Sequence, residues 1–204
     1  PSRDGNPVSE DSKPEPVSAY GRSKLEGERS VLAHKDRLPV TIIRPPAIYG
    51  PRDKDMFMLF KMLKKGIFLC WGKCYYSLLY VDDLVRGIIL CAESREAEGK
   101  IYYLSDGNIY SNYEISDSIS SALGAGRPFR LRIPKGIMPV IAGIGQSLSS
   151  RSNIINRDKI RELRHSHWIC DSSKSREELG FIPKVGIKEG MKWTADWYRI
   201  HRWL

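Results

Sequence analysis

The fold class is decided by the stretch LPVTIIRPPAIYG at residues 38–50. Within it, residues 40–45 form a β-branched apolar run between turn residues, which is typical of a buried strand in a parallel sheet. Before this run, residues 18–34 carry apolar and charged side chains at helical spacing. In that helix, Leu25, Val31 and Leu32 would face the protein interior, and Glu26, Glu28 and Arg29 would face solvent. A helix that leads into a fully apolar strand indicates an α/β fold.

Residues 46–54 (PAIYGPRDK) hold two prolines and a glycine, so we expect a loop that leaves the carboxyl end of this strand. Sheets of α/β proteins bind their ligands at that end. Further strand-like segments follow at residues 67–71, 77–81 and 101–105. Helices are expected at residues 55–64, 83–94, 112–123, 134–149, 156–164, 172–179 and 187–203.

The helix at residues 83–94 begins at the end of the sequence YVDD, and Asp82 or Asp83 can cap its amino end. Its apolar face would contain Leu84, Val85, Ile88, Ile89 and Cys91. We attribute no catalytic role to the two aspartates, since capping explains them.

The composition is that of a globular protein and argues against a nucleic-acid-binding protein or a disulfide scaffold. The chain has 204 residues, 41% of them hydrophobic and 28% charged, as in an ordinary globular protein. The net charge of +9 permits anionic ligands, but the basic residues are scattered rather than gathered into a stripe, which argues against nucleic-acid binding. The four cysteines are too few for a disulfide scaffold, so we expect reduced thiols and a cytoplasmic location.

No targeting or membrane segment is expected. Residues 1–17 hold four prolines and several charges, and they indicate an extended surface loop without the features of a signal peptide. The most apolar stretch, residues 136–145 (GIMPVIAGIG), is about half of the roughly 20 residues that span a bilayer. We expect a buried helix there, with contact to a membrane or a partner as the alternative.

The best candidates for chemistry are Tyr20 and Lys24 in the sequence YGRSK. Four residues apart on a helix, their side chains share one face. An ammonium group beside a phenol favours the phenolate, which would allow Tyr20 to exchange a proton with a substrate hydroxyl or carbonyl. The spacing alone is not specific, and an exposed pair on a solvated helix is the alternative.

The context of this pair is more specific. PVSAYGRSKLEGE, LPVTIIRPPAIYGPRD and LLYVDDLVRGI follow one another at characteristic spacing. Together with GKIYYLSDG and the late segment WICDSSKSREELGFIP, they resemble the extended short-chain dehydrogenase/reductase superfamily, in its NAD-dependent epimerase/dehydratase and 3β-hydroxysteroid dehydrogenase-like group. The resemblance implies the carboxyl-terminal part of a Rossmann-like parallel sheet, within residues 1–106, and a small, mostly helical substrate lobe at residues 107–204.

The resemblance also implies residue roles. Tyr20 would be the catalytic acid/base, and Lys24 would tune it and bind the nicotinamide ribose. Pro46, Ala47 and Ile48 would lie beside the nicotinamide ring of NAD or NADP. Tyr49 and Arg52 would face a small-molecule substrate of sugar, steroid or flavonol type. An ordinary β-to-α loop is the alternative for this segment.

The sequence departs from the family pattern in three respects. It contains no GxxGxxG or GxGxxG after a strand, and the family's catalytic Ser or Thr would precede residue 1. We therefore expect a carboxyl-terminal portion that is inactive and binds cofactor poorly by itself. Many UDP-sugar enzymes of the family also carry an Arg-Asp pair where this chain has Tyr76 and Ser77, which argues against a UDP-sugar substrate.

Other possibilities are weaker. His165, His167 and Cys170 match no standard zinc spacing, so we expect no metal site. The resemblance implies a homodimer that pairs through the helix of residues 18–34. The main alternative to an enzyme is a non-catalytic protein that kept the fold and binds a partner or an anionic ligand.

Overall fold

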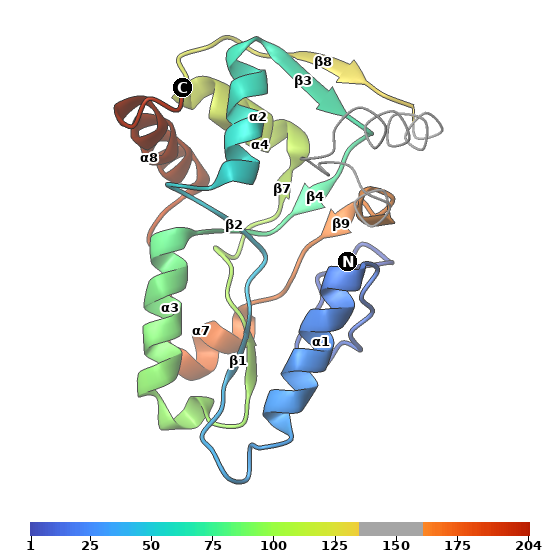
Figure 1. The fold of residues 1–204 in the computed structure, drawn as a ribbon, viewed down its shortest axis with the longest axis vertical. Coiled ribbons are helices and arrows are strands. Elements are labelled where there is room, and N and C mark those ends of the chain that lie inside the picture. The colour runs from blue at the N-terminus through green and yellow to red at the C-terminus, as the bar shows by residue number, and fades with distance from the viewer. Residues whose placement is uncertain (135–160) are drawn as a thin grey trace.

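The computed structural model describes residues 1–134 and 161–204. Its elements form two groups, one above the other in Figure 1. The lower group holds α1 (Ala19–Leu32), β1 (Ile42–Arg44), α3 (Val81–Glu93), the short helix η1 (Arg95–Ala97), β6 (Ile101–Tyr103) and α7 (Ser173–Leu179). The upper group holds α2 (Lys54–Lys64), β3 (Ile67–Cys70), β4 (Tyr75–Tyr76), β7 (Tyr110–Ser111), α4 (Asn112–Ala122), β8 (Phe129–Arg132), β9 (His167–Trp168) and α8 (Ile187–Ile200).

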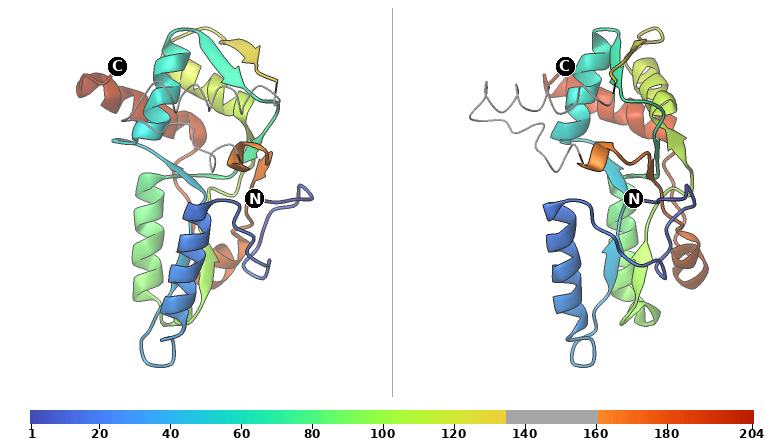
Figure 2. Two further views of the ribbon diagram at one scale, coloured as in Figure 1. Left: turned by 45° about the vertical axis from the view of Figure 1, so that its right-hand side comes forward. Right: turned by 90° about the vertical axis from the view of Figure 1, so that its right-hand side faces the viewer.

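The lower group is built on a parallel pair of strands. β1 and β6 pair with Ile43 opposite Tyr102 and Arg44 opposite Tyr103. Because successive side chains of a strand point to opposite faces, these two pairs face different helices. Ile43 and Tyr102 pack into a core with residues of α3 and α7, whereas Arg44 faces α1. In the right-hand view of Figure 2, α1 and α7 lie on opposite sides of the strands. The predicted α/β class is confirmed.

A second parallel pair joins the two groups. β2 (Ala47–Tyr49) pairs with β5 (Leu78–Tyr80), and Tyr49 lies opposite Tyr80. The prediction of a loop over the whole of residues 46–54 is therefore wrong for its first part. The two prolines at residues 45 and 46 do not prevent pairing, because the strand begins after them.

The upper group combines short strands with three helices. β3 and β8 are parallel, and β4 lies between β7 and β9 in a second small sheet. α4 begins with a reciprocal cap, in which the Ser111 hydroxyl accepts the Glu114 N–H and the Glu114 carboxylate accepts the Ser111 N–H. This pattern explains why the expected helix at 112–123 agrees closely with α4.

Two separate hydrophobic cores correspond to the two groups. The upper core contains buried residues of α2, β3, α4 and α8, among them Phe60, Phe68, Ile119 and Tyr198. The lower core contains Leu79, Cys91, Ala97, Tyr102, Leu104, Leu179 and Phe181. α2 and β3 precede residue 106 yet pack in the upper core, and α7 follows it yet packs in the lower core. A domain boundary at residues 106–107 stays a prediction, and the packing crosses it in both directions.

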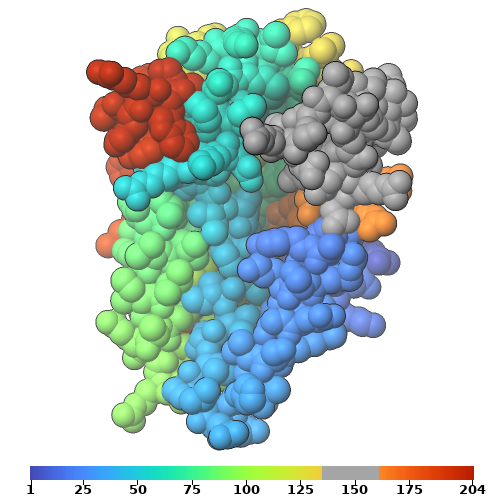
Figure 3. Space-filling model, viewed as in Figure 1, coloured from blue at the N-terminus to red at the C-terminus, as the bar shows by residue number. Residues whose placement is uncertain are grey.

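α1 lies on the surface, where it forms part of the lower right face in Figure 3. None of its residues is buried. Leu25 and Leu32 are half-buried, but Val31, which we expected to face inward, is 44% exposed. Glu28, expected to face outward, instead turns toward β1 and binds Arg44. An ion pair therefore attaches this helix where we expected apolar packing.

α3 also departs from the expectation. Val85, Ile88 and Ile89 are exposed rather than packed as one apolar face. The residue before the helix is Tyr80, and no side chain caps the amino end. Capping by Asp82 or Asp83 is therefore wrong, and Asp83 has a different role that is described below.

The N-terminal segment is irregular, as expected, but it is attached to the rest of the chain. Val8 forms a parallel bridge with Cys170, and the Glu10 carboxylate accepts the Tyr103 N–H at 2.7 Å. The four cysteines, all in the described part of the chain, form no disulfide. Within residues 1–134 and 161–204, no helix has the length and apolarity needed to cross a membrane.

The helices expected at 134–149 and 156–164, and the apolar stretch 136–145, fall wholly or mainly on residues outside the described ranges. The expected helices at 172–179 and 187–203 agree with α7 and α8 apart from a few residues at their ends.

Candidate active site

Local sequence explains where α1 begins. Ser18 is the N-cap residue, with extended backbone, and its hydroxyl accepts the N–H of Gly21 at 3.1 Å. Tyr20 therefore lies in the first turn, one turn before Lys24. Pro16 packs close to Gly21, where a β-carbon would lie 3.1 Å from the proline ring. These contacts hold the end of the helix that carries the candidate pair.

The structure brings Tyr20 and Lys24 together. The Lys24 ammonium lies over the Tyr20 ring, 5.4 Å from its centroid. This distance is within the range of cation–π attraction. Tyr20 is 68% exposed, so its hydroxyl is accessible to a ligand.

The same end of the lower group carries residues 46–48. α1 and β1 run in opposite directions (Figure 1), and Glu28 contacts Arg44 between them. Tyr20 lies eight residues before Glu28, about 12 Å along the helix. Ile48 lies four residues beyond Arg44, about 13 Å along the extended chain. Measured along the direction of β1, Tyr20 and Ile48 therefore lie at about the same height, beyond the carboxyl end of that strand.

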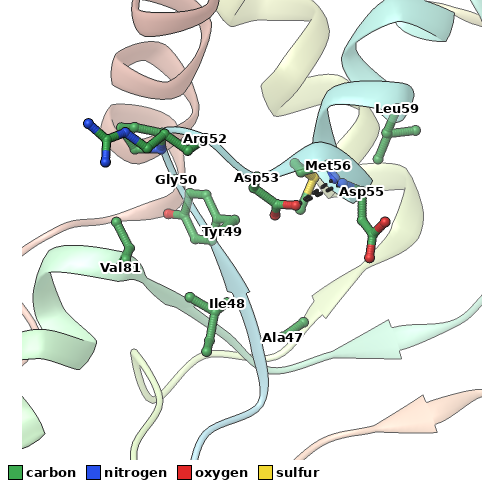
Figure 4. Close-up of a pocket in the computed structure, with 11 residues that line it drawn as sticks. Ala47, Ile48, Tyr49, Gly50, Arg52, Asp53, Asp55, Met56, Leu59 and Val81 are labelled. Carbon is green, nitrogen blue, oxygen red and sulfur yellow. Dashed lines mark hydrogen bonds between the residues drawn. The ribbon is translucent and has the colours of Figure 1, made fainter.

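A pocket of about 640 Å³ opens beyond this level, between β2, the start of α2 and the start of α3. Figure 4 shows its side chains. Its walls are formed by Ala47, Ile48, Tyr49, Gly50, Pro51, Arg52, Asp53, Asp55, Met56, Leu59 and Val81. Ala47 and Ile48 are exposed, and Pro46 is half-buried. The pocket thus combines an apolar wall with several charged side chains.

Tyr49, which we expected to face a substrate, lines the pocket but is almost completely buried. It is 1% exposed, its ring packs edge to face on Tyr80, and its buried hydroxyl has no hydrogen-bond partner within the described residues. Burial raises the pKa of Tyr49 well above its usual value. The hydroxyl fits against Gly190 of α8, where a β-carbon would collide with it. Tyr49 therefore closes the wall of the pocket and joins it to α8.

Arg52 is exposed at one end of the pocket, with its guanidinium extending away from Asp53 in Figure 4. Its backbone has φ of 70°, in the left-handed region. This conformation costs an ordinary residue about 1 kcal/mol or more. The turn between β2 and α2 therefore holds Arg52 in an unusual position at the pocket entrance.

Asp53 is a pocket residue that our sequence reasoning missed. Its carboxylate accepts the N–H groups of Asp55 and Met56 at 2.9 and 3.1 Å and so caps α2 (Figure 4). Its carbonyl oxygen accepts the hydroxyl of Tyr198 at 2.6 Å. The aspartate just before an apolar helical run was the signal that could have identified it.

Asp83 connects α3 to the segment that precedes α8. Its carboxylate is fully buried and accepts the N–H groups of Lys184 and Val185, just before α8. It also pairs with Arg86 of its own helix. This tertiary role replaces the helix cap that the sequence suggested.

Tyr76 and Ser77, which stand where we looked for an Arg-Asp pair, are turned inward. The Ser77 hydroxyl accepts the Cys170 N–H at 3.1 Å and is buried. Burial raises the pKa of Tyr76 far above its usual value. Neither residue presents a positive charge to the pocket. In the described ranges, no three His, Cys, Asp or Glu side chains are grouped as a metal site.

A sequence profile of the NAD dependent epimerase/dehydratase family matches residues 1–105. This range includes the Tyr20–Lys24 pair and the lining of the pocket. The chain belongs to this family. Membership confirms the extended short-chain dehydrogenase/reductase superfamily that the motifs indicated.

Two curated relatives show the breadth of the epimerase/dehydratase family. The ceramide reductase of Caulobacter vibrioides is 31% identical over 92% of this chain and 59% of its own. The UDP-glucose 4-epimerase of Vibrio cholerae is 30% identical over 94% and 57%, respectively. The chain therefore spans less than two thirds of the length of these relatives.

A solved structure supports the fold. The dTDP-glucose 4,6-dehydratase from Streptomyces venezuelae with NAD and TYD bound superposes with a TM-score of 0.74 at 24% identity. The match covers 98% of this chain and 57% of that protein. It shows that the described arrangement of helices and strands is that of an epimerase/dehydratase family fold.

Proposed function

We propose that this chain provides the active-site helix and the substrate pocket of an NAD(P)-dependent epimerase, dehydratase or reductase. The substrate would be a small molecule with a reactive hydroxyl or carbonyl group. The observation that carries the proposal is the Lys24 ammonium over the exposed Tyr20 ring, level with residues 46–48. The epimerase/dehydratase family profile over residues 1–105 supports it.

Tyr20 would move the proton. As a phenolate it would accept the proton of a substrate hydroxyl while hydride leaves the carbon that bears this hydroxyl. In the reverse direction, the phenol would give the proton to the carbonyl oxygen. Lys24 would favour the phenolate and hydrogen-bond a ribose hydroxyl. A bound nicotinamide supplies the hydride acceptor or donor, chemistry that no side chain offers.

The described residues fit the nicotinamide end of such a cofactor. Ala47 and Ile48 offer exposed apolar surface beside the half-buried Pro46, and Lys24 offers a cation at the same level. Arg52 would contact the substrate at the pocket entrance. The sequence contains no GxxGxxG or GxGxxG motif to receive a pyrophosphate, so the adenosine end would need residues outside this sequence.

Tyr20→Phe tests the function. In the full-length protein, we expect turnover to fall at least 100-fold, the lower range for loss of an acid/base, while cofactor affinity hardly changes. The assay would follow nicotinamide reduction with secondary alcohols of sugar, sterol and sphingoid type. Tyr75→Phe is the matched control, because Lys73 lies 5.1 Å from the Tyr75 ring, away from the candidate site. Turnover near the wild-type value in Tyr20→Phe would contradict the role given to Tyr20, whereas the absence of turnover in the wild type would favour the non-catalytic binding protein.

The expected homodimer and cytoplasmic location belong to the same proposal. Light scattering of the full-length protein would test the first, and cell fractionation the second.

A further inference from the structure

The face of α1 that carries the candidate pair also carries a carboxylate. Tyr20, Lys24 and Glu28 follow one another at intervals of four residues, so their side chains lie in one row. On a helix, a lysine and a glutamate four residues apart are within reach of an ion pair. Glu28 is therefore placed to draw the Lys24 ammonium away from Tyr20.

In the structure, however, the Glu28 carboxylate is bound by the Arg44 guanidinium and not by Lys24. The Nε of Arg44 donates to Oε2 of Glu28 at 3.0 Å, and a terminal nitrogen donates to Oε1 at 2.5 Å. Both oxygens are thus engaged by one guanidinium in a bidentate pair. The two side chains are only 16% and 14% exposed, so water screens this pair weakly.

Arg44 is held in place by a second contact besides Glu28. Its guanidinium lies 5.7 Å from the centroid of the Tyr103 ring, on the neighbouring strand. The hydrogen bonds that Arg44 donates to Glu28 raise the pKa of Arg44, so its charge is permanent. Within the described residues, the ionisable groups that face Arg44 are Glu28 and Tyr103, and those that face Tyr103 in turn include Glu10 and Cys170.

We propose that Arg44 is a positioning residue that keeps Lys24 available to Tyr20 by occupying both carboxylate oxygens of Glu28. Lys24 lies over the Tyr20 ring, one turn from a carboxylate whose charge is already neutralised. Arg44 touches neither Tyr20 nor Lys24, and it acts through Glu28. The catalytic value of this arrangement rests on the proposed function, whereas the coupling among the four side chains does not.

The coupling predicts shifts of opposite sign for two substitutions. Arg44→Met would leave a free Glu28 carboxylate to attract Lys24 away from Tyr20, so the phenolate of Tyr20 should be less favoured. Glu28→Gln would remove the competitor and leave Arg44 charged, so the phenolate of Tyr20 should be more favoured. The double variant should return toward the wild type.

A merely structural ion pair would behave differently. Both single substitutions would loosen α1, and neither would move the ionisation of Tyr20 in a direction set by charge. Arg44→Lys is a further control, because it keeps the positive charge while losing the bidentate geometry. It should stay closer to the wild type than Arg44→Met does.

The measurement is an NMR pH titration of the chain with tyrosine labelled at the ring Cζ, in which Tyr20→Phe identifies the Tyr20 signal. Opposite shifts for Arg44→Met and Glu28→Gln support the proposal, and equal or absent shifts overturn it. If Arg44→Met does not fold, Glu28→Gln decides, since easier ionisation of Tyr20 in that variant supports the proposal and any other result overturns it. The titration needs no turnover, so a failure of the proposed function would appear only in the assay of Tyr20→Phe.

Discussion

The buried carboxylate of Asp83 accepts the backbone N–H of Val185 at 2.9 Å, and it thereby joins the first turn of α3 to the chain that enters α8. α8 in turn packs through Gly190 on Tyr49, in the wall of the pocket. Asp83 thus fixes the position of a pocket wall without lining the pocket.

Asp83→Asn should destabilise the fold by about 1–3 kcal/mol, because an amide nitrogen would face backbone N–H donors that now find an acceptor. Urea unfolding followed by circular dichroism measures the change. The exposed neighbour supplies the control, since Asp82→Asn should alter stability by less than about 0.5 kcal/mol. Equal stabilities of the two variants would contradict the role given to Asp83.

Lys24→Ala should lower both turnover and cofactor affinity of the full-length protein, unlike Tyr20→Phe. The ammonium favours the phenolate, and it is also the expected partner of a ribose hydroxyl. Steady-state kinetics and cofactor titration separate the two effects. Lys73→Ala removes a similar ammonium from Tyr75 and should change neither quantity.

UDP-glucose should bind the full-length protein weakly or not at all. Tyr76 and Ser77 supply no guanidinium that could hold a diphosphate with two hydrogen bonds, and both are turned inward. Calorimetric titration tests this, with the UDP-glucose 4-epimerase of Vibrio cholerae as the positive control. A micromolar dissociation constant would show that another part of the protein holds the nucleotide.

The chain of 204 residues should not bind NADH with a submillimolar dissociation constant. In this fold most of the affinity comes from the pyrophosphate on a glycine-rich turn at a helix N-terminus, and the sequence has no such turn. Calorimetry of the chain with NADH, compared with the full-length protein, measures the difference. Equal affinities would place the cofactor site within these residues.

Acid should destabilise the lower group partly through Glu178. Its carboxylate accepts hydrogen bonds from Lys100 and from the hydroxyl of Tyr102, which lower the pKa of Glu178. A lowered pKa contributes stability above the pKa of the unfolded chain, near 4.3, and that contribution is lost as the pH falls further. Between about pH 4.5 and pH 3, Glu178→Gln should lose stability less steeply than the wild type in urea unfolding. Glu177→Gln, at an exposed neighbour, should follow the wild type.

Local signals in the sequence predicted much of the fold. The apolar runs at residues 40–45 and 101–105 became the parallel pair of β1 and β6. The sequence Ser111–Glu114 carries its own cap, so α4 could be placed almost to the residue. The close spacing of Tyr20 and Lys24 also followed from helical periodicity alone.

The errors concern residues whose role depends on distant parts of the chain. Asp83 looked like a helix cap because its partners, Lys184 and Val185, are about a hundred residues away. β2 was missed because its pairing with β5 is tertiary, whereas the prolines before it signal a loop. The burial of Tyr49 depends on the absence of a side chain at Gly190, which no pattern around Tyr49 reveals.

The separation of the two cores has an optical consequence. The chain has five tryptophans, and none belongs to the lower core. Trp197 and Trp203 pack with Tyr198 in the upper core. Tryptophan fluorescence should therefore report the melting of the upper group, while helices α1, α3 and α7 contribute to the circular dichroism signal alone. Two transitions that do not coincide would reveal that the halves of this chain unfold as separate units.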